Sequence, residues 1–340
     1  MPYAAIDLHV RRSEVLIVDE TGAVVLARRI DTKREQFRQI FADRPSMRIL
    51  LESCTHSEWV AQCLEGYGHD VIVADPNYAP MYEGRVRKIK TDRRDVAALA
   101  RACRLGIYRP AHRVSPQQRD RRRALRVRRQ LVQMRGRAVQ LIGAYLRQEG
   151  LRLPPGGAET VLARLARVPM PAPLAAVLEP LREVVGTIAT VIARADAAIT
   201  AVAREDVVIK RLMTAPGVGP IVAATFHAVL DSPERFDGDA RRATAFLGLV
   251  PREYSSGERR HKGRITKGGP SELRSLLVQA SWTVWRSRSA PASRLRAWAH
   301  TLAARRGRQV AVVALARRLA RILVAMWRDE TEFRWTPMTA

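Results

Sequence analysis

The sequence predicts an α/β N-terminal domain followed by a mainly α-helical remainder. Short apolar runs typical of strands alternate with helix-like stretches in about the first 100 residues, and strand patterns fade after that point. Two long segments then carry helical apolar spacing. A length of 340 residues allows two or three domains.

The strands of the first domain are expected in two groups. Residues 4–7, 15–18 and 24–30 are short β-prone runs, and Glu20-Thr21-Gly22 supplies a turn, so an antiparallel meander is predicted. Buried strands are expected at 48–52 and 70–74, with a helix at 57–64 between them.

Two long helices are expected next. Residues 116–148 contain strong helix formers, lack internal prolines after the first position and carry arginines on one face. From Leu174 to Val202 apolar residues recur every three or four positions. Proline- and glycine-rich segments at 154–157 and 169–173 separate the two helices, which favours an antiparallel hairpin or coiled coil. Such a pair packs within its own monomer or serves as an oligomerisation arm, and the spacing does not choose between these.

The charge of the chain is large and unevenly distributed. There are 59 Lys and Arg against 33 Asp and Glu, a net charge of +26, while 47% hydrophobic residues exclude a disordered polybasic tail. Residues 1–100 are neutral, whereas 101–150 carry +12 and 251–340 carry +13. Blocks of this kind indicate a nucleic-acid partner.

A membrane partner and a disulfide framework are not expected. The chain has no uncharged apolar run of the ~18 residues that a membrane span needs and no basic-then-apolar signal pattern at its start. Cys54, Cys63 and Cys103 form no C-x-x-C pair, which argues against a zinc site. We therefore expect a cytoplasmic, nucleoid-associated protein.

Four carboxylates form the first candidate site. Asp7 closes the first strand and Glu52 closes a later one, so both are expected at one edge of the sheet. Asp92 and Asp95 are three residues apart at a predicted helix start and share a helix face. Hard oxygen ligands of this kind suit Mg²⁺, which supports phosphoryl transfer. Each acid taken alone is better explained as a solvated charge or, for Asp92, a helix cap.

A basic segment at 251–269 forms the second candidate site. Small residues place Ser255 and Ser256 among cations that suit a phosphate. These cations are Arg252, Arg259, Arg260, Arg264 and Lys267. A Ser-Ser-Gly loop on its own is more often a simple turn, so the phosphate contact is the firmer expectation.

Two further groups are candidates for backbone contact. Pro216-Gly217-Val218-Gly219 lies between apolar helical segments, and Gly217 and Gly219 allow N–H groups to approach a phosphate, although an ordinary helix turn fits equally well. The basic face of the 116–148 helix supplies Arg121, Arg122, Arg123, Arg126, Arg128 and Arg129. His9, His227 and His261 have no metal-ligand spacing and receive no role. Trp282, Trp285, Trp298 and Trp327 are assigned to the core or to an interface.

The ordered set of these motifs resembles the transposases of the insertion-sequence one-ten family, which are bridge-RNA-guided DEDD/serine recombinases. The matching stretches cover nearly the whole chain. They are Ala5-Ile6-Asp7, Leu51-Glu52-Ser53, Lys90-Thr91-Asp92 with Asp95-Val96, Pro216-Gly217-Val218-Gly219, Gly248-Leu249-Val250-Pro251-Arg252 and Tyr254-Ser255-Ser256-Gly257 with Gly263-Arg264-Ile265-Thr266-Lys267. One stretch departs from the pattern: Ser53-Cys54-Thr55 stands where the family commonly has Ala-Thr-Gly.

The resemblance implies three parts with separate roles. Residues 1–112 would form a RuvC-like, RNase H-like domain whose acidic tetrad Asp7, Glu52, Asp92 and Asp95 binds Mg²⁺. Residues 113–208 would form a coiled-coil arm, and residues 209–340 a C-terminal transposase domain with a helix-hairpin-helix-like element and the nucleophilic Ser256. Donor and target DNA would be selected by a structured guide RNA, and the protein would act as a homo-oligomer, a dimer or tetramer.

Two other functions fit part of the pattern. A Mg²⁺-dependent, structure-specific nuclease resembling junction resolvases would cut with the tetrad alone, and its serine loop would only bind phosphate. A non-catalytic nucleic-acid-binding protein would bind with steep salt dependence and without any effect of Mg²⁺.

Overall fold

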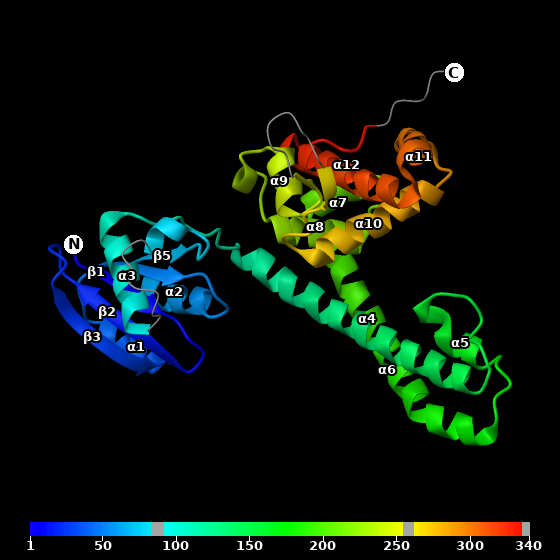
Figure 1. Ribbon diagram of the computed structural model, residues 1–340, viewed down its shortest axis with the longest axis horizontal. Coiled ribbons are helices and arrows are strands. Elements are labelled where there is room, and N and C mark those ends of the chain that lie inside the picture. The colour runs from blue at the N-terminus through cyan, green and yellow to red at the C-terminus, as the bar shows by residue number, and fades with distance from the viewer. Residues whose placement is uncertain (83–91, 254–261, 335–340) are drawn as a thin grey trace. The chain divides into compact units, whose positions relative to one another are not determined.

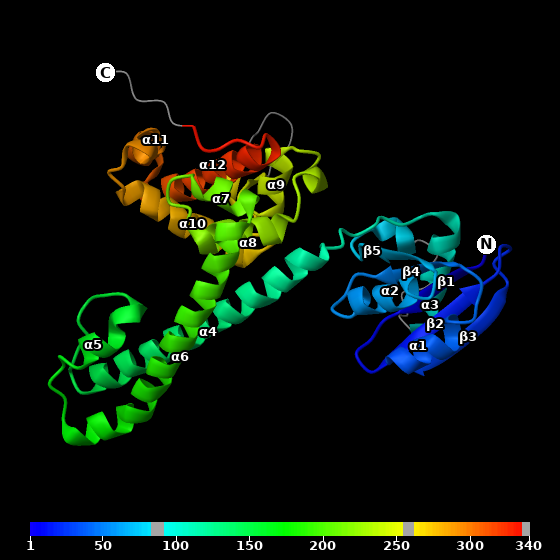
Figure 2. The same ribbon diagram turned by 180° about the vertical axis from the view of Figure 1, so that it is seen from behind.

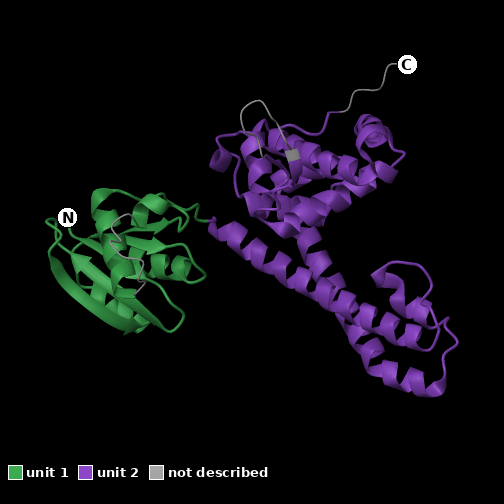
Figure 3. Ribbon diagram, viewed as in Figure 1, with its two compact units in different colours: residues 1–113 green, residues 114–340 purple. Residues whose placement is uncertain are grey.

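The computed structural model describes residues 1–82, 92–253 and 262–334, and it divides into two compact units, residues 1–113 and 114–340 (Figure 3). The first boundary lies one residue after the end of the expected 1–112 domain. The expected boundary at 208/209 falls inside helix α7 (Val207–Met213), within the second unit.

The first unit is built on a five-stranded sheet of order β3-β2-β1-β4-β5 (Figure 1). Its strands are β1 (Tyr3–Asp7), β2 (Arg12–Val18), β3 (Val24–Asp31), β4 (Arg48–Glu52) and β5 (Asp70–Ala74). β1, β2 and β3 pair antiparallel, and β1–β4 and β4–β5 pair parallel. The predicted strands and meander are confirmed, and this mixed order is that of an RNase H-like sheet.

Helices cover both faces of this sheet. They are α1 (Arg34–Phe41), α2 (Ser57–Glu65) and α3 (Asp92–Leu105). Because successive strand residues face opposite ways, Ala4 and Ile6 of β1 pack with α1 and α2, whereas Ala5 packs with α3. The predicted α/β domain therefore has three layers, with α3 on the face opposite α1 and α2.

The second unit begins with the expected helical hairpin. Its long helices are α4 (Pro116–Gln148) and α6 (Ala172–Glu205), which pack along each other, and the short α5 (Val161–Leu165) lies between them in the chain (Figure 2). Ser115 caps α4 by accepting a hydrogen bond from the N–H of Gln118 at 3.4 Å, with Pro116 at the first helical position. Part of the predicted apolar stripes forms the hairpin core, including Ile142, Leu146, Leu178 and Val185. Leu141, Val177 and Val184 of the same stripes are exposed.

Helix α6 is more apolar than the sequence analysis suggested. One 18-residue window has a mean hydropathy of 1.5, so by length and composition α6 alone among the described helices is able to cross a membrane. Only 22% of this window is buried. A single helix of this kind is weak support for a membrane protein, and here it is one half of a hairpin.

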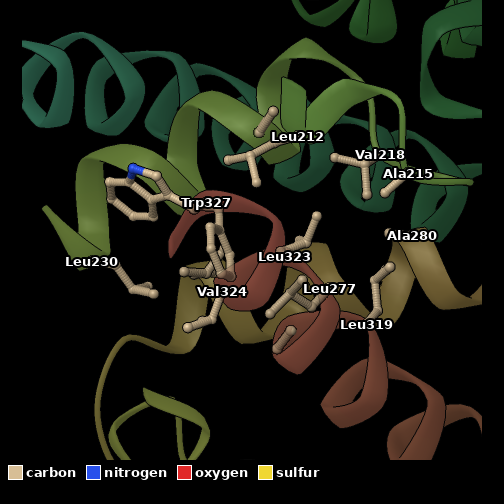
Figure 4. Close-up of a cluster of buried hydrophobic side chains, with 14 of the residues drawn as sticks. Leu212, Ala215, Val218, Leu230, Leu277, Ala280, Leu319, Leu323, Val324 and Trp327 are labelled. Carbon is tan, nitrogen blue, oxygen red and sulfur yellow. The ribbon is translucent and has the colours of Figure 1, made fainter. Parts of the chain in front are cut away.

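The rest of the second unit is a helical body with one hairpin of strands. Its helices are α7 (Val207–Met213), α8 (Pro220–Leu230), α9 (Ala240–Phe246), α10 (Ser271–Arg286), α11 (Ser293–Arg306) and α12 (Arg308–Arg328). Figure 4 shows Leu319, Leu323 and Trp327 of α12 in the core, near Leu277 of α10. The segment expected to be a basic loop contains strands β6 (Pro251–Glu253) and β7 (Lys262–Ile265), which pair antiparallel.

Candidate active site

Parallel pairing brings the first two carboxylates to one edge of the sheet. Ile6 of β1 is aligned with Leu51 of β4, so Asp7 and Glu52 both end strands that run the same way. Helix α3 packs against β1 and β4 and begins at Asp92. Asp7 and Asp95 are buried, with 8% and 5% of their surfaces exposed. Three secondary-structure elements therefore bring the four acids together in the first unit.

The electrostatics of Asp7 show that the acids interact. Burial raises the pKa of Asp7 above its usual value, and the negative charges of Glu52, Asp95 and Asp92 raise it further, while His9 opposes the shift. Carboxylates that repel one another in a partly buried site are stabilised by a cation. Asp7, His9 and Asp92 form a donor set that is compatible with a divalent metal ion.

His9 belongs to this site, although its position in the sequence did not predict a role. The Nε2 atom of His9 lies 3.4 Å from Asp7 Oδ2 and 3.7 Å from Asp92 Oδ1. One ligand atom from each of these three residues lies within 4.8 Å of the other two. The sequence shows that His9 follows Asp7 by two residues, but the proximity of His9 to Asp92 depends on how α3 packs.

Tyr82 and Arg29 were also missed by the sequence analysis. The hydroxyl of Tyr82 donates a hydrogen bond to Oε1 of Glu52, and the Nη2 atom of Arg29 lies 3.8 Å from Asp92 Oδ2. Tyr82 ends a single turn of 3-10 helix at 79–82, far from Glu52 in sequence. No local spacing links these residues to the acids, so only the fold reveals them.

The turn after Glu52, where the chain departs from the family pattern, is closed by a serine. Ser57 donates from its hydroxyl to the carbonyl of Cys54 at 2.9 Å and accepts from the N–H of Cys54 at 3.2 Å. The N–H of Ser53 donates to the carbonyl of Ala74 at 2.8 Å. The turn therefore leaves Glu52 at a defined strand end.

The candidate serines fall between β6 and β7. Ser255, Ser256, Arg259 and Arg260 lie outside the described residues. The other predicted cations of this segment are exposed: Arg252 on β6, Arg264 on β7 and Lys267 just after β7. All three belong to the β6–β7 hairpin or to the residues that follow it.

Two glycines fix the base of this hairpin. Gly248 has φ +66° and Gly269 has φ +65°, which is backbone geometry that favours glycine. A Cβ on Gly248 would lie 2.3 Å from the carbonyl oxygen of Gly268, and a Cβ on Gly269 would meet the carbonyl oxygen of Phe246. The two chain segments beside the hairpin therefore lie too close together for a side chain at either glycine position.

The arginines of α4 divide into two groups. Four make bonds inside the second unit: Arg121 with Asp206, Arg122 with the carbonyls of Ala228 and Val229, Arg128 with Asp196, and Arg129 with Glu272. Arg123 and Arg126 are exposed, and among the described residues Arg123 pairs only with the exposed Asp120. Among the six predicted arginines, Arg123 and Arg126 are therefore the two most open to an external partner.

The Pro-Gly-Val-Gly turn joins α7 to α8. Gly217 has φ +77°, and a Cβ there would lie 2.6 Å from the carbonyl oxygen of Ala280 on α10. Gly219 precedes α8 as its N-cap and has no neighbour within 4 Å of such a Cβ. A cavity of about 450 Å³ adjoins the turn and is lined on its other side by Thr283, Ser287, Ser289 and Pro291.

Comparison with known proteins gives matches over most of the chain. A family model described as "Transposase", for the DEDD transposases of IS110 elements, matches residues 4–150. A second, described as "Transposase IS116/IS110/IS902 family", matches residues 209–296.

Individual relatives match over nearly their whole length. A probable family 20 transposase of Pseudomonas aeruginosa is 32% identical over 97% of both chains. The transposase for insertion sequence element IS1328 of Yersinia enterocolitica is 30% identical over 96% of this chain and 97% of its own. The transposase for insertion sequence element IS1111A of Coxiella burnetii is 27% identical over 93% and 87%.

Proposed function

The chain belongs to the IS116/IS110/IS902 family of insertion-sequence transposases, enzymes that act on DNA, and from this premise we propose how its own residues do so. Ser256 is the nucleophile that cuts and rejoins DNA, assisted by Mg²⁺ on Asp7, Glu52, Asp92 and Asp95. The observation that carries the proposal is the convergence of these four acids from β1, β4 and α3. Burial raises the pKa of Asp7 there, and the negative charges of the other three acids raise it further.

The four acids would hold Mg²⁺ through carboxylate oxygens, the ligands that this ion prefers. When bound, the ion would offset negative charge on the reacting phosphate. Tyr82 fixes one oxygen of Glu52 by its hydrogen bond, and His9 lies between Asp7 and Asp92. Both side chains orient the carboxylates and reduce the conformational freedom lost on binding.

The cutting step is a transesterification. The Oγ atom of Ser256 loses its proton as it attacks a backbone phosphorus and the Oγ–P bond forms. The P–O bond to the adjacent deoxyribose breaks, and the leaving oxygen takes up one proton, so the step is balanced. Attack by a free hydroxyl end of another strand reverses the step and joins donor to target. Because the phosphoserine link keeps the bond energy, no external energy source is needed.

The basic side chains near the serine would bind the phosphates on either side of the reacting one. Arg252, Arg264 and Lys267 are exposed on or beside the β6–β7 hairpin, and Arg259 and Arg260 belong to the same stretch of sequence. Guanidinium groups pair with phosphate oxygens in a bidentate manner. Gly217 and Gly219 would form a helix-hairpin-helix-like element that contacts the backbone through N–H groups of α8.

The division of labour follows the three parts proposed from the sequence: residues 1–112 for the metal, 113–208 for the arm and 209–340 for the serine. Donor and target DNA would be chosen by a structured guide RNA. Arg123 and Arg126 on α4 would contact the backbone of one of these nucleic acids, and Arg121, Arg122, Arg128 and Arg129 would join only by exchanging their present partners. The enzyme would act in the cytoplasm at the nucleoid.

The helical arm of α4 and α6 would mediate association of the protein into a homo-oligomer, a dimer or tetramer. Exposed apolar residues recur at seven-residue intervals on α4, at Val127, Met134 and Leu141, and on α6, at Val177 and Val184. A heptad stripe that no residue of the hairpin covers is typical of helices that pack against another chain. Light scattering coupled to size exclusion tests this, since V127E together with M134E would shift the mass to that of a monomer.

The experiment that tests the catalytic proposal compares two adjacent serines. S256A should abolish both the covalent protein–DNA species and recombination, whereas S255A, the matched control, should retain them. D7A should lose cleavage in Mg²⁺. If S256A still cuts and leaves free hydrolysed ends, the protein is a metal-dependent nuclease like the junction resolvases. Sequencing of RNA that co-purifies with the protein tests the guide.

A further inference from the structure

Helices α10, α11 and α12 carry an uncompensated positive charge outside the serine hairpin. Residues 273–328 contain twelve arginines and no Asp or Glu. In the same unit, α4 is also rich in arginine, whereas α6 holds three arginines against four acids, so the imbalance is not shared by every helix. Unpaired charges of one sign repel one another and reduce the stability of a folded unit, which implies a partner that offsets them.

Several of these arginines have structural roles inside the unit. Arg274 donates to the carbonyls of Leu247 and Gly268, and Arg296 donates to the carbonyl of Ser287. Arg318 lies over the ring of Trp298 at 4.7 Å. The remainder includes Arg286, Arg305 and Arg306, which are exposed and form no hydrogen bond or ion pair within the described residues.

An aromatic contact brings Arg308 of α12 to the last turns of α10, where Arg286 lies. The guanidinium of Arg308, the first residue of α12, lies 5.6 Å from the ring centre of Trp282 on α10. Arg286 follows Trp282 by four residues, one helical turn, and so shares its face. Arg305 and Arg306 end α11, separated from Arg308 only by Gly307 with φ +81°. We call Arg286, Arg305, Arg306 and Arg308 the α11–α12 arginine cluster.

The cluster rests on a rigid base. Trp285 of α10 stacks on His300 of α11, with ring centres 4.0 Å apart and planes 20° from parallel, and α11 packs against both α10 and α12 (Figure 1). Because Arg308 covers Trp282 and His300 covers Trp285, these rings hold helices together and are not offered to bases.

Helix stability does not explain the whole cluster. Cations at the C-terminal end of a helix are favourable, which accounts for Arg286, Arg305 and Arg306. Arg308, however, begins α12, where the helix dipole disfavours a cation. The presence of Arg308 at the start of α12, packed on Trp282, therefore indicates that positive charge is required where α11 ends and α12 begins.

We infer that the α11–α12 arginine cluster is a second DNA-binding surface that contacts phosphates of duplex DNA without reading bases. DNA is the polyanion on which this family acts, and four guanidiniums on rigid helix ends suit a regular array of phosphates. The inference requires neither the serine nor the metal, so it stands or fails separately from the proposed chemistry.

The test measures how DNA affinity depends on salt in the full-length protein. The variant R305Q/R306Q removes two exposed, unpaired charges and keeps good helix formers, so the fold is retained. The matched control R194Q/R204Q removes two exposed arginines from α6, which make no bond within the described residues. The probes are a random-sequence duplex DNA and a random-sequence RNA hairpin, and melting curves check folding.

The expected result is a shallower plot of log affinity against log salt for R305Q/R306Q on duplex DNA. The slope falls by about 0.9 for each lost phosphate contact, hence by about 1.8 for the pair. R194Q/R204Q should keep the slope of the unaltered protein. An unchanged DNA slope in R305Q/R306Q overturns the inference, and so does a slope that falls on the RNA hairpin alone or equally in the control.

Discussion

Arg121 of α4 donates a hydrogen bond from Nη2 to Oδ2 of Asp206 at 2.6 Å, and the side chains of the two residues are only 13% and 12% exposed. Asp206 also caps α7 by accepting the N–H of Ile209 at 2.9 Å. The same Arg121 lies 3.0 Å from the ring nitrogen Nδ1 of His227 on α8. This pair therefore ties the base of the helical arm to the body that carries the serine hairpin.

The first prediction concerns the stability of this joint. Breaking a buried ion pair leaves the other charge without compensation, so R121A should lower the free energy of unfolding by about 3 kcal/mol. The exposed Arg123 forms an ion pair with the exposed Asp120, and R123A should change the free energy of unfolding by less than about 0.5 kcal/mol. Denaturant melts of both variants check this. Equal losses in the two would contradict it.

The second prediction separates nucleic-acid contact from stability on α4. R123Q/R126Q should melt like the unaltered protein. Its plot of log affinity for nucleic acid against log salt should be shallower by about 1.8, because each lost phosphate contact removes about 0.9 from the slope. The measurement is a salt titration with duplex DNA and with RNA. Retention of the full slope on both would remove Arg123 and Arg126 from the interface.

The third prediction is a dependence of stability on pH that originates at His227. Burial lowers the pKa of His227 below its usual 6.5, with Asp206 opposing the shift and Arg121 adding to it, while Gln118 and Trp327 also contact the ring. Because the folded-state pKa is depressed, the stability contributed by the neutral His227 ring is fully present above pH 6.5. It is lost as the pH falls through the folded-state pKa.

The free energy of unfolding should therefore fall from about pH 7.5 to about pH 5.5, and fall less in H227Q, whose side chain does not titrate. Denaturant melts at both pH values measure the difference. A loss of the same size in H227Q would assign the pH dependence to other groups.

The α/β domain and the hairpin were predictable because their signals are local. Strand alternation, the Glu20-Thr21-Gly22 turn and the apolar spacing from Leu174 depend on neighbours in the sequence. Parallel pairing of β1 and β4 then follows from fold class, which explains why Asp7 and Glu52 were expected together. The partners of these acids were not predictable, since Tyr82 and His9 reach Glu52 and Asp92 only through tertiary packing.

Arginine roles were the least accessible to sequence reasoning. Arg121 and Arg123 are two residues apart on one basic helix, and their local patterns are indistinguishable. What separates them is the presence of Asp206, 85 positions further along the chain, beside one and not the other. Charge composition predicted the partner of the protein as a whole and could not assign it to individual side chains.

The fourth prediction concerns the cost of gathering the carboxylates. A raised pKa for Asp7 means that stability is lost as the pH rises from 3.8 through the folded-state value, so the ionised site is destabilising at neutral pH. D7N should therefore protect β1 and α3 from hydrogen exchange more than the unaltered protein does, when both are in chelator.

Added Mg²⁺ should make the unaltered protein better protected from hydrogen exchange than D7N. At 100 times its dissociation constant, the ion would stabilise the unaltered first unit by about 2.7 kcal/mol and D7N by much less. Hydrogen exchange of peptides from 1–10 and 92–105 measures both conditions in the full-length chain. Similar protection by Mg²⁺ in the two proteins would mean that Asp7 is not a ligand.

The fifth prediction uses the two glycines of the α7–α8 turn as a matched pair. G217A should destabilise the second unit by about 1–3 kcal/mol, because Gly217 has φ +77° and a Cβ there lies 2.6 Å from the carbonyl of Ala280. Gly219 has φ −94° and open space around it, so G219A should retain the fold at the small cost of a poorer N-cap.

The two variants therefore separate packing from phosphate contact. Pro220 lacks an N–H, so a phosphate at the start of α8 would be bound by the N–H groups of Ile221 and Val222, and the methyl of G219A would hold it away. Loss of DNA affinity in a fully folded G219A would identify the turn as a backbone contact. Full affinity in G219A would mean that Gly217 is required only because α10 passes too close for a side chain.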